Sequence, residues 1–215
     1  MKHIAYYCIL FFGLTDTLCL IGDSPEPYRS IKTLPYVEHG WFPDTNKAYL
    51  LRFIEQLRPK VVVEVGSWLG LSTMEMAYHL QSGARLYAVD TWQGSVEHIK
   101  IPEFKAFLPT LFRQFLSNVK HKGLTEIIVP IRMSSLEAAA SLEVMPQLIY
   151  IDASHAEEDV YNDIIAWYKK LTPGGILCGD DWNAWASVRK GVLRAVYNLR
   201  VIVHYDNNFW YFDPK

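Results

Sequence analysis

Six ionisable residues lie at or just after the ends of apolar runs of strand length: Glu64, Asp90, Asp152, His155, Asp180 and Asp181. In an open parallel sheet the carboxyl ends of the strands form the ligand-binding edge, so these side chains are expected to gather there. Carboxylates that share a site repel one another unless a cation lies among them, and all-oxygen ligands suit Mg²⁺, Mn²⁺ or Ca²⁺. Asp152, Asp180 and Asp181 therefore form a candidate divalent-metal site. The alternative is that Asp180 or Asp181 caps the helix that follows.

His155 is the candidate general base of this group. It follows Asp152 by three residues in the sequence IDASH, and an imidazole is close to its neutral form at pH 7. Asp152 and His155 are accordingly the candidate catalytic residues. A histidine taken alone serves more often as a surface or capping residue.

The stretch VVVEVGSWLGLS, residues 61–72, predicts a strand, a glycine turn and a helix in that order. Gly66 and Gly70 can adopt backbone angles that other residues avoid, and they let a ligand approach the main chain. Free N–H groups and the positive end of the helix then face the ligand site. The dinucleotide fingerprint G-x-G-x-x-G is absent, because Trp68 stands where its second glycine would be, so a pyrophosphate fits poorly.

A ligand without phosphates fits this turn better, and Glu64 at the end of the strand suits a cationic group. S-adenosylmethionine has both properties. Asp90 ends a second apolar strand, RLYAVD, at the position where α/β sites hold a ribose through its hydroxyls. The alternatives are an ordinary strand-to-helix turn for the glycine pair, and a helix cap or solvated loop acid for Asp90.

Apolar strands alternate with amphipathic helices from Asn46 onward, which predicts an α/β fold of the Rossmann type. We expect a mostly parallel seven-stranded sheet with helices on both faces and a C-terminal antiparallel hairpin around the turn signal Asn207 and Asn208. The expected strands cover residues 61–65, 85–90, 126–133, 147–155 and 176–182 and two segments within 200–214. The expected helices cover residues 46–57, 71–80, 104–119, 157–171 and 186–198, with a short one that starts after Ser134 or Ser135 and ends near residue 142.

The composition is that of a soluble globular protein, with 50% hydrophobic residues, 20% charged residues and a net charge of -2. Without a basic surplus, nucleic acid is not an expected partner. Cys8, Cys19 and Cys178 form neither a disulfide framework nor a zinc spacing. Residues 46–215 are expected to form the functional domain, and the proline-containing residues 23–45 a linker or lid.

Residues 1–22 have a basic start and an apolar run over residues 4–14, which is the length of a signal peptide. Extended through Gly22, the run approaches a membrane span, although Asp16 interrupts it. A cleaved signal and an uncleaved anchor are the favoured interpretations, and a helix packed on the domain or a mis-assigned start is the third. We expect a cytoplasmic domain, membrane-associated through residues 4–22 if they form an anchor, with export as the alternative.

Together these motifs resemble the class I S-adenosylmethionine-dependent methyltransferases, and within them the metal-dependent O-methyltransferases typified by catechol O-methyltransferase. EVGSWLGLS is similar to the first motif of that family. The resemblance implies that Gly66 and Ser72 hold the methionine part of the donor, with Glu64 orienting that end. It also implies that Asp90 binds the ribose hydroxyls and that Ser135, in MSSLEAA, lies near the adenine.

For the acidic residues the resemblance implies metal ligation by Asp152, Asp180 and Asp181. The catechol enzyme has Asp-Asn at the pair and a lysine base, where this chain has Asp181 and His155. The double aspartate of GDDW resembles the metal-dependent sugar O-methyltransferases instead. The acceptor is therefore expected to be a hydroxyl of a small molecule or a sugar.

The expected function is methyl transfer from S-adenosylmethionine to that hydroxyl, assisted by a divalent metal, Mg²⁺ being favoured. Two alternatives stay open. One is a nicotinamide oxidoreductase on a similar fold, against which the missing glycine fingerprint argues. The other is a catalytically silent, membrane-tethered module that binds the donor.

Overall fold

The computed structural model describes residues 24–215, apart from the side chains of Val96 and Glu97. Strands and helices alternate from α1 onward, as the sequence predicts. The signal or anchor predicted at residues 1–22 lies outside the described residues. Within residues 24–215, no helix is both long and apolar enough to span a bilayer.

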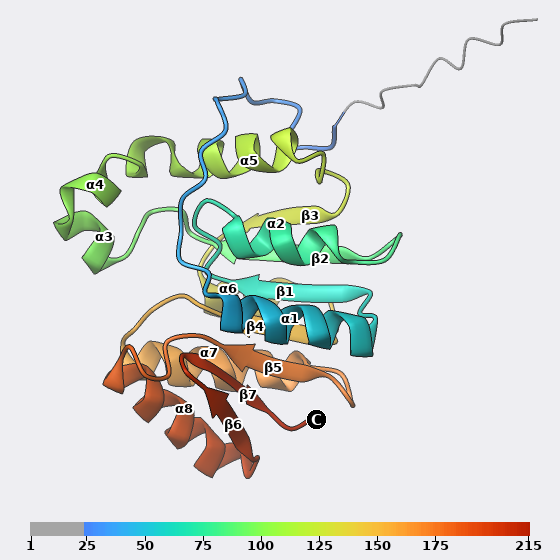
Figure 1. Ribbon diagram of the computed structural model, residues 1–215, viewed down its shortest axis with the longest axis vertical. Helices are drawn as coiled ribbons and strands as arrows, with labels where there is room; N and C mark the ends of the chain where they lie inside the picture. The colour runs from blue at the N-terminus through green and yellow to red at the C-terminus, as the bar shows by residue number, and fades with distance from the viewer. Residues whose placement is uncertain (1–23) are drawn as a thin grey trace, which may run out of the picture.

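Seven strands form one sheet in the order β3-β2-β1-β4-β5-β7-β6 (Figure 1). The strands are β1 (Val61–Val65), β2 (Arg85–Asp90), β3 (Ile128–Arg132), β4 (Leu148–Ile151), β5 (Ile176–Gly179), β6 (Val203–Asp206) and β7 (Phe209–Phe212). The first five are parallel, whereas β7 pairs antiparallel with β5 and β6. The predicted seven-stranded sheet with a C-terminal antiparallel hairpin is therefore confirmed. Because β1 and β4 are neighbours, the turns that follow them meet at one edge of the sheet.

Helices cover both faces of this sheet. The helices are α1 (Asp44–Leu57), α2 (Leu71–Tyr78), α3 (Val96–Lys100), α4 (Pro102–Lys105), α5 (Leu111–His121), α6 (Ser135–Ser141), α7 (Glu157–Lys170) and α8 (Ala186–Leu199). Buried side chains of α1, α2 and α5 belong to one apolar cluster, and those of α6, α7 and α8 belong to a second. The sheet separates the two clusters, so the domain has three layers.

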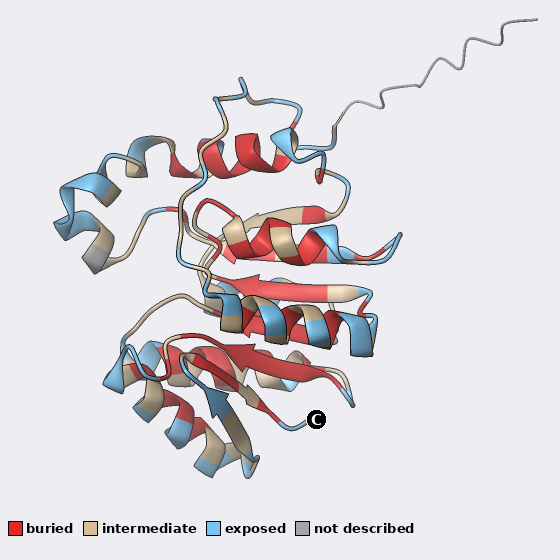
Figure 2. Cartoon of the chain, in the orientation of Figure 1, coloured by how far each residue is buried: buried red, intermediate tan, exposed pale blue. Residues whose placement is uncertain are grey.

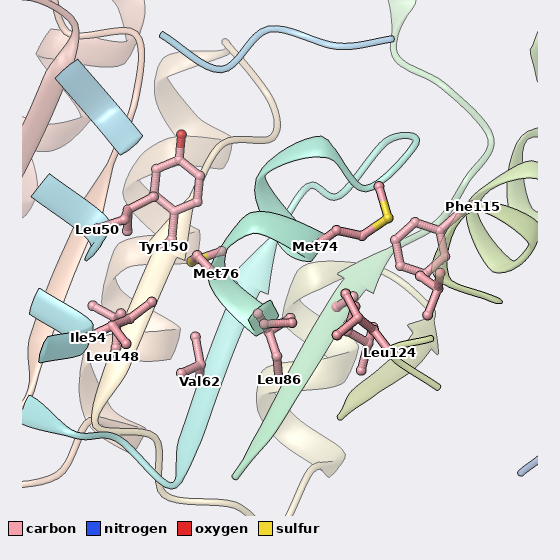
Figure 3. Packing of buried hydrophobic residues seen from close by; sticks show 14 of the residues in the cluster. Leu50, Ile54, Val62, Met74, Met76, Leu86, Phe115, Leu124, Leu148 and Tyr150 are labelled. Atoms are coloured by element: carbon pink, nitrogen blue, oxygen red, sulfur yellow. The ribbon is translucent and has the colours of Figure 1, made fainter. Parts of the chain in front are cut away.

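Alternation along the strands explains the two clusters, because successive strand side chains point to opposite faces. In β1, Val62 packs in the cluster of α1, whereas Val63 and Val65 pack in the cluster of α7. Figure 3 shows the first cluster, with Leu50 and Ile54 of α1 lying over the strands. Figure 2 shows the central strands buried and the outer helix surfaces exposed, as expected for strands covered on both faces.

The helix predicted over residues 104–119 is wrong in its first half. α4 ends at Lys105, a 3₁₀ turn η1 (Leu108–Thr110) follows, and α5 begins only at Leu111. Pro109 lies within the 3₁₀ turn. A proline inside a helix removes one backbone donor and disfavours helical angles in the residue before it, so a continuous helix cannot run through this position unbroken.

Residues 24–43, predicted as a linker or lid, pack along α5 and are called the strap below (Figure 1). Its backbone is held by polar side chains of α5: the amide of Gln114 donates to the oxygen of Pro35 at 2.8 Å, and the Oδ1 of Asn118 accepts the N–H of Val37 at 3.1 Å. Near its start the Tyr28 side chain is buried in the first cluster. The strap is therefore part of the packed domain.

Candidate functional site

The glycine turn after β1 lies directly against the end of β4. Gly66 has a φ of +89°, and a Cβ at this position would lie 1.9 Å from the backbone oxygen of Asp152. Gly70, also at φ +89°, precedes α2, and a Cβ there would lie 3.0 Å from the ring of Phe115. Both positions therefore require glycine, and the close approach brings the end of β1 next to Asp152.

Glu64 is fully buried beneath this turn. One carboxylate oxygen accepts the hydroxyl of Ser72 at 2.5 Å, and the other accepts the hydroxyl of Ser67 at 2.8 Å and that of Thr73. Burial raises the pKa of Glu64 to about 7, although the three hydroxyl hydrogen bonds act in the opposite direction. The structure thus brings Glu64 and Ser72, two predicted donor-binding residues, into one hydrogen-bonded group that ties β1 to the first turn of α2.

Asp90, at the end of β2, holds the same turn from the other side. Its Oδ2 accepts the backbone N–H groups of Ser67 and Trp68, both at 3.0 Å, and its Oδ1 accepts that of Trp92 at 2.7 Å. Burial raises the pKa of this carboxyl, and the three N–H groups act against the rise. Asp90 as a whole residue is half-buried at the end of β2.

Aromatic side chains of the strap, of the glycine turn itself and of α3 pack together at the turn. The indole N–H of Trp68 donates to His39 of the strap at 3.1 Å, and the Trp68 ring stacks on His98 with 4.2 Å between ring centroids. Trp41 of the strap lies beside both rings and remains 54% exposed. The amide of Asn118 joins strap and turn, since it donates to the backbone oxygen of Leu69 at 2.9 Å as well as to the strap.

Ser135 lies at the start of α6, and its hydroxyl accepts the indole N–H of Trp167 at 2.9 Å. Ser134, not Ser135, is the residue that caps α6, through a hydrogen bond from the N–H of Glu137. The hydroxyl of Ser135 also acts to lower the pKa of Asp163 on α7, which burial raises to about 6. The side chain of Ser135 is therefore engaged with α7.

The acids after β4 and β5 form an electrostatically linked group. The pKa of Asp152 is raised well above its ordinary value, first by burial and then by the negative charges of Asp180 and Asp181. Burial also raises the pKa of Asp180, while the amide of Asn46 on α1 acts against the rise. Within the described residues, the Oδ1 of Asp180 is buried and accepts no hydrogen bond. A cavity of about 10 Å³ is lined by all three aspartates together with apolar side chains.

His155 and Asp181 form a pair at this edge. The Nε2 of His155 lies 2.9 Å from the Oδ2 of Asp181, and the imidazole stacks on Trp185 with a centroid distance of 4.4 Å and an interplanar angle of 13°. Capping of α8 by Asp180 or Asp181 is wrong, because the cap residue is Trp185 and no side chain makes the cap hydrogen bond. The orientation of His155 is therefore set on two sides, by a carboxylate and by an aromatic ring.

In this conformation Asp152, Asp180 and Asp181 do not form a complete metal site. Across residues 24–215, no three or more His, Cys, Asp or Glu side chains lie in an arrangement that could hold a metal ion. Asp181, one of the three predicted ligands, instead contacts His155. The donor set nevertheless has the all-oxygen chemistry that Mg²⁺ prefers.

Three residues at this site escaped the sequence analysis. Asn46, fully buried, donates to the hydroxyl of Tyr150, which donates in turn to Asp152 at 3.3 Å. Trp185 carries no motif that distinguishes it from a packing aromatic. Asn208 was noted only as a turn residue, yet its side chain contacts the loop after Asp181.

Comparison with known proteins gives a family and a fold. Residues 63–182 match the family described as "Methyltransferase domain". The O-methyltransferase hkm8 of Aspergillus hancockii is 29% identical over 134 residues, which cover 62% of this chain and 47% of that protein. An uncharacterized protein, y4gI of Sinorhizobium fredii, is 26% identical over 63% of this chain and 16% of its own length. The chain thus spans about half of the first relative and less of the second.

Solved structures share the architecture at low sequence identity. The O-methyltransferase TomG from Streptomyces achromogenes, in complex with SAM, superposes with a TM-score of 0.63 at 12% identity and covers 81% of this chain and 82% of its own. An O-methyltransferase from Bacillus cereus, in complex with SAH, gives a TM-score of 0.59 at 15% identity over 83% and 84% of the two chains. At these identities the likeness shows the fold.

Proposed function

Because this chain belongs to the methyltransferase-domain family that its residues 63–182 match, we propose that it transfers a methyl group from S-adenosylmethionine to a hydroxyl of a small molecule or sugar. The observation that carries the proposal is the pairing of a glycine turn, held by Glu64 and Asp90, with a histidine–aspartate pair at the same sheet edge. The first group suits a donor that is cationic and lacks phosphates. The second suits removal of a proton.

The donor side of the site is proposed to comprise Glu64, Gly66, Gly70, Ser72, Asp90 and Ser135. Gly66 lets the turn after β1 lie directly against the backbone of Asp152, and Asp90 is assigned the ribose hydroxyls because it ends β2 at the edge of the sheet. Glu64 acts from below the turn, because its oxygens are taken by hydroxyls of the turn and α2. Its negative charge favours a cationic ligand above it.

The acceptor side is proposed to use His155 as the base. In an in-line displacement the bond from sulfur to the methyl carbon breaks as the bond from the acceptor oxygen forms, and S-adenosylhomocysteine leaves. The hydroxyl proton passes to His155, and Asp181 at 2.9 Å stabilises the imidazolium that results. This pair favours catalysis over a silent donor-binding module, and Trp68 in the turn argues against a nicotinamide cofactor.

A divalent cation held by Asp152, Asp180 and Asp181 remains a separate part of the proposal. Three observations support it: the pKa of Asp152 is raised by burial and then by the charges of Asp180 and Asp181, the Oδ1 of Asp180 is buried without a hydrogen bond from any described residue, and a small cavity lies among the three residues. Among the described residues the three carboxylates, as they stand, do not form an arrangement that could hold one ion. When bound there, a cation would orient the acceptor oxygen and stabilise its negative charge.

The donor assignment is tested by binding. S-adenosylhomocysteine should raise the melting temperature of the protein, whereas NAD should not, because ligand that binds only the folded state stabilises it. Asp90→Ala should weaken donor binding by roughly 1–3 kcal/mol in calorimetric titration, since a charged hydrogen-bond acceptor is lost. A rise in melting temperature with NAD equal to that with S-adenosylhomocysteine would rule out the assignment of the donor.

The transfer itself is tested with labelled donor and a panel of phenols, sugars and aliphatic alcohols. His155→Gln should keep donor affinity and lose product formation. If the cation is used, chelator should abolish transfer, added Mg²⁺ should restore it, and an Asp180→Asn and Asp181→Asn double variant should bind donor without activity. Full activity of the double variant in chelator would leave the metal without a role. Donor binding without any methylated product from the panel would favour the silent module.

A further inference from the structure

The turn between β6 and β7 holds the loop that carries the acidic pair. The backbone oxygen of Asn208 accepts the N–H of Trp182 at 2.9 Å, and its side-chain Oδ1 accepts the N–H groups of Asn183 and Ala184 at 3.2 and 3.0 Å. The amide of Asn183 donates back to the backbone oxygen of Asn207 at 2.7 Å. The β6–β7 turn and the loop between β5 and α8 are thus joined by four hydrogen bonds. Figure 1 shows the β6–β7 turn at the same sheet edge as the end of β5.

The loop that Asn208 holds, residues 181–185, adopts an unfavourable backbone conformation. Asp181 has a φ of +70°, in the left-handed region that costs a residue with a Cβ about 1 kcal/mol. Such a conformation persists only where its surroundings enforce it. The hydrogen bonds that Asn208 accepts begin at Trp182, the residue after Asp181, and continue through Ala184, so they constrain the chain directly after the strained position.

Two residues of this loop contact His155. At one end of the loop, the carboxylate of Asp181 lies 2.9 Å from the imidazole. At the other end, the ring of Trp185 stacks on the imidazole, and the Trp185 N–H donates to the backbone oxygen of Asp181 at 3.1 Å. A change in the path of residues 183 and 184 would displace the ring of Trp185, which directly follows them.

The same hairpin contacts the chain on either side of the strained residue. The indole N–H of Trp210 on β7 donates to the backbone oxygen of Asp180 at 2.8 Å, and Tyr205 on β6 stacks on Trp182 with 4.7 Å between centroids. These contacts fix the start of the loop. The side chain of Asn208 reaches further, to the two amides between Trp182 and Trp185.

We propose that Asn208 is a positioning residue for His155: its side-chain oxygen fixes residues 183 and 184 and thereby places the ring of Trp185 against the imidazole. That the placed imidazole serves methyl transfer rests on the proposed function. The positioning itself is a property of the loop and is measurable without any substrate.

The test compares Asn208→Ala with Asn208→Asp, which keeps an oxygen able to accept both N–H groups. In protein labelled with ¹³C-histidine, the carbon-bound protons of His155, assigned with His155→Gln, should show an upfield ring-current displacement from Trp185. Asn208→Ala should lose this displacement, and the amides of Asn183 and Ala184 should exchange with solvent roughly 10-fold faster or more, because each loses a hydrogen bond. Asn208→Asp should retain both signals.

The matched control is Asn198→Ala, which removes an exposed asparagine of α8 that donates to the hydroxyl of Tyr161 on α7. It should leave the signals of His155 and of the loop unchanged. Should Asn208→Ala fail to fold, Asn208→Ser takes its place, because the shorter side chain cannot reach both amides. An unaltered His155 signal and unaltered exchange in a folded Asn208 variant would overturn the proposal.

Activity provides the second readout. With an acceptor that the wild type methylates, Asn208→Ala should lower kcat at least 10-fold and leave donor affinity unchanged, and Asn208→Asp should restore kcat. A loss of donor affinity equal to the loss of rate would indicate general disruption and contradict the proposal. If the wild type methylates no acceptor, the proposed function fails, while the spectra of His155 still decide whether Asn208 positions the ring.

Discussion

Replacing Glu64 by glutamine should change how the stability of the protein depends on pH. Glu64 is fully buried and its pKa is raised from 4.5 to about 7. Between these two values the folded protein binds more protons than the unfolded chain, so the free energy of unfolding falls as pH rises through this window. A difference of roughly 2.5 pKa units corresponds to about 3 kcal/mol, which is lost by pH 8 and fully present below pH 4.5.

Glutamine has nearly the same shape and carries no charge, so it removes this contribution to the pH dependence. Its amide can still bond to the hydroxyls of Ser67, Ser72 and Thr73, because a hydroxyl both donates and accepts. Urea unfolding at pH 5, 6, 7 and 8 measures the unfolding free energy of the wild type and of Glu64→Gln. The value for the wild type minus the value for the variant should fall by up to about 3 kcal/mol as pH rises.

The difference between the two proteins is the informative quantity, since other buried carboxyls titrate in both. Exposed Glu143 provides the control, and Glu143→Gln should give a curve parallel to that of the wild type. Donor affinity of Glu64→Gln should fall at pH 8, where the wild type carries the charge. Parallel pH curves for the wild type and Glu64→Gln would refute the reasoning, because they would mean that Glu64 has the same pKa in the folded and unfolded states.

Two further changes test the turn and the strap. Gly66→Ala would place a Cβ 1.9 Å from the backbone oxygen of Asp152, so we expect a loss of roughly 3 kcal/mol or more in urea unfolding, and a variant as stable as the wild type would contradict this geometry. Asn118→Ala leaves the backbone oxygens of Val37 and Leu69 without their donor. The change should lower the free energy of unfolding by about 1–3 kcal/mol and speed cleavage of the strap by a protease. Resistance to the protease equal to that of the wild type would show that the strap is held by its other contacts.

Much of the fold could be predicted from local signals. The run 61–65 is β-branched and continuous, which is typical of a strand buried on both faces, and Gly66 ends it where the chain must turn. The polar residues after such strands were correctly predicted to gather at one edge, because parallel strands share the direction of their ends. The prediction of one helix around residues 104–119 took no account of Pro109, which lies in the 3₁₀ turn that separates α4 from α5.

The partners of the site residues could not be predicted in the same way. The contact of Asp181 with His155 joins the loops after β5 and β4, and the contacts of Asn208 join the loop after β5 to the β6–β7 turn. Such contacts have no periodic signature, since they join segments by tertiary packing. The buried Asn46, whose bonds reach across to β4, is unrecognisable in sequence for the same reason.

The contacts of Asn208 have a consequence for the order of events during synthesis. Asp181 and Trp185 leave the ribosome before β6 and β7, whereas the turn between these two strands carries Asn208. A domain generally folds as a unit. The loop after Asp181 can therefore receive its hydrogen bonds from the N–H groups of Asn183 and Ala184 to Asn208 only once the β6–β7 turn has been synthesised.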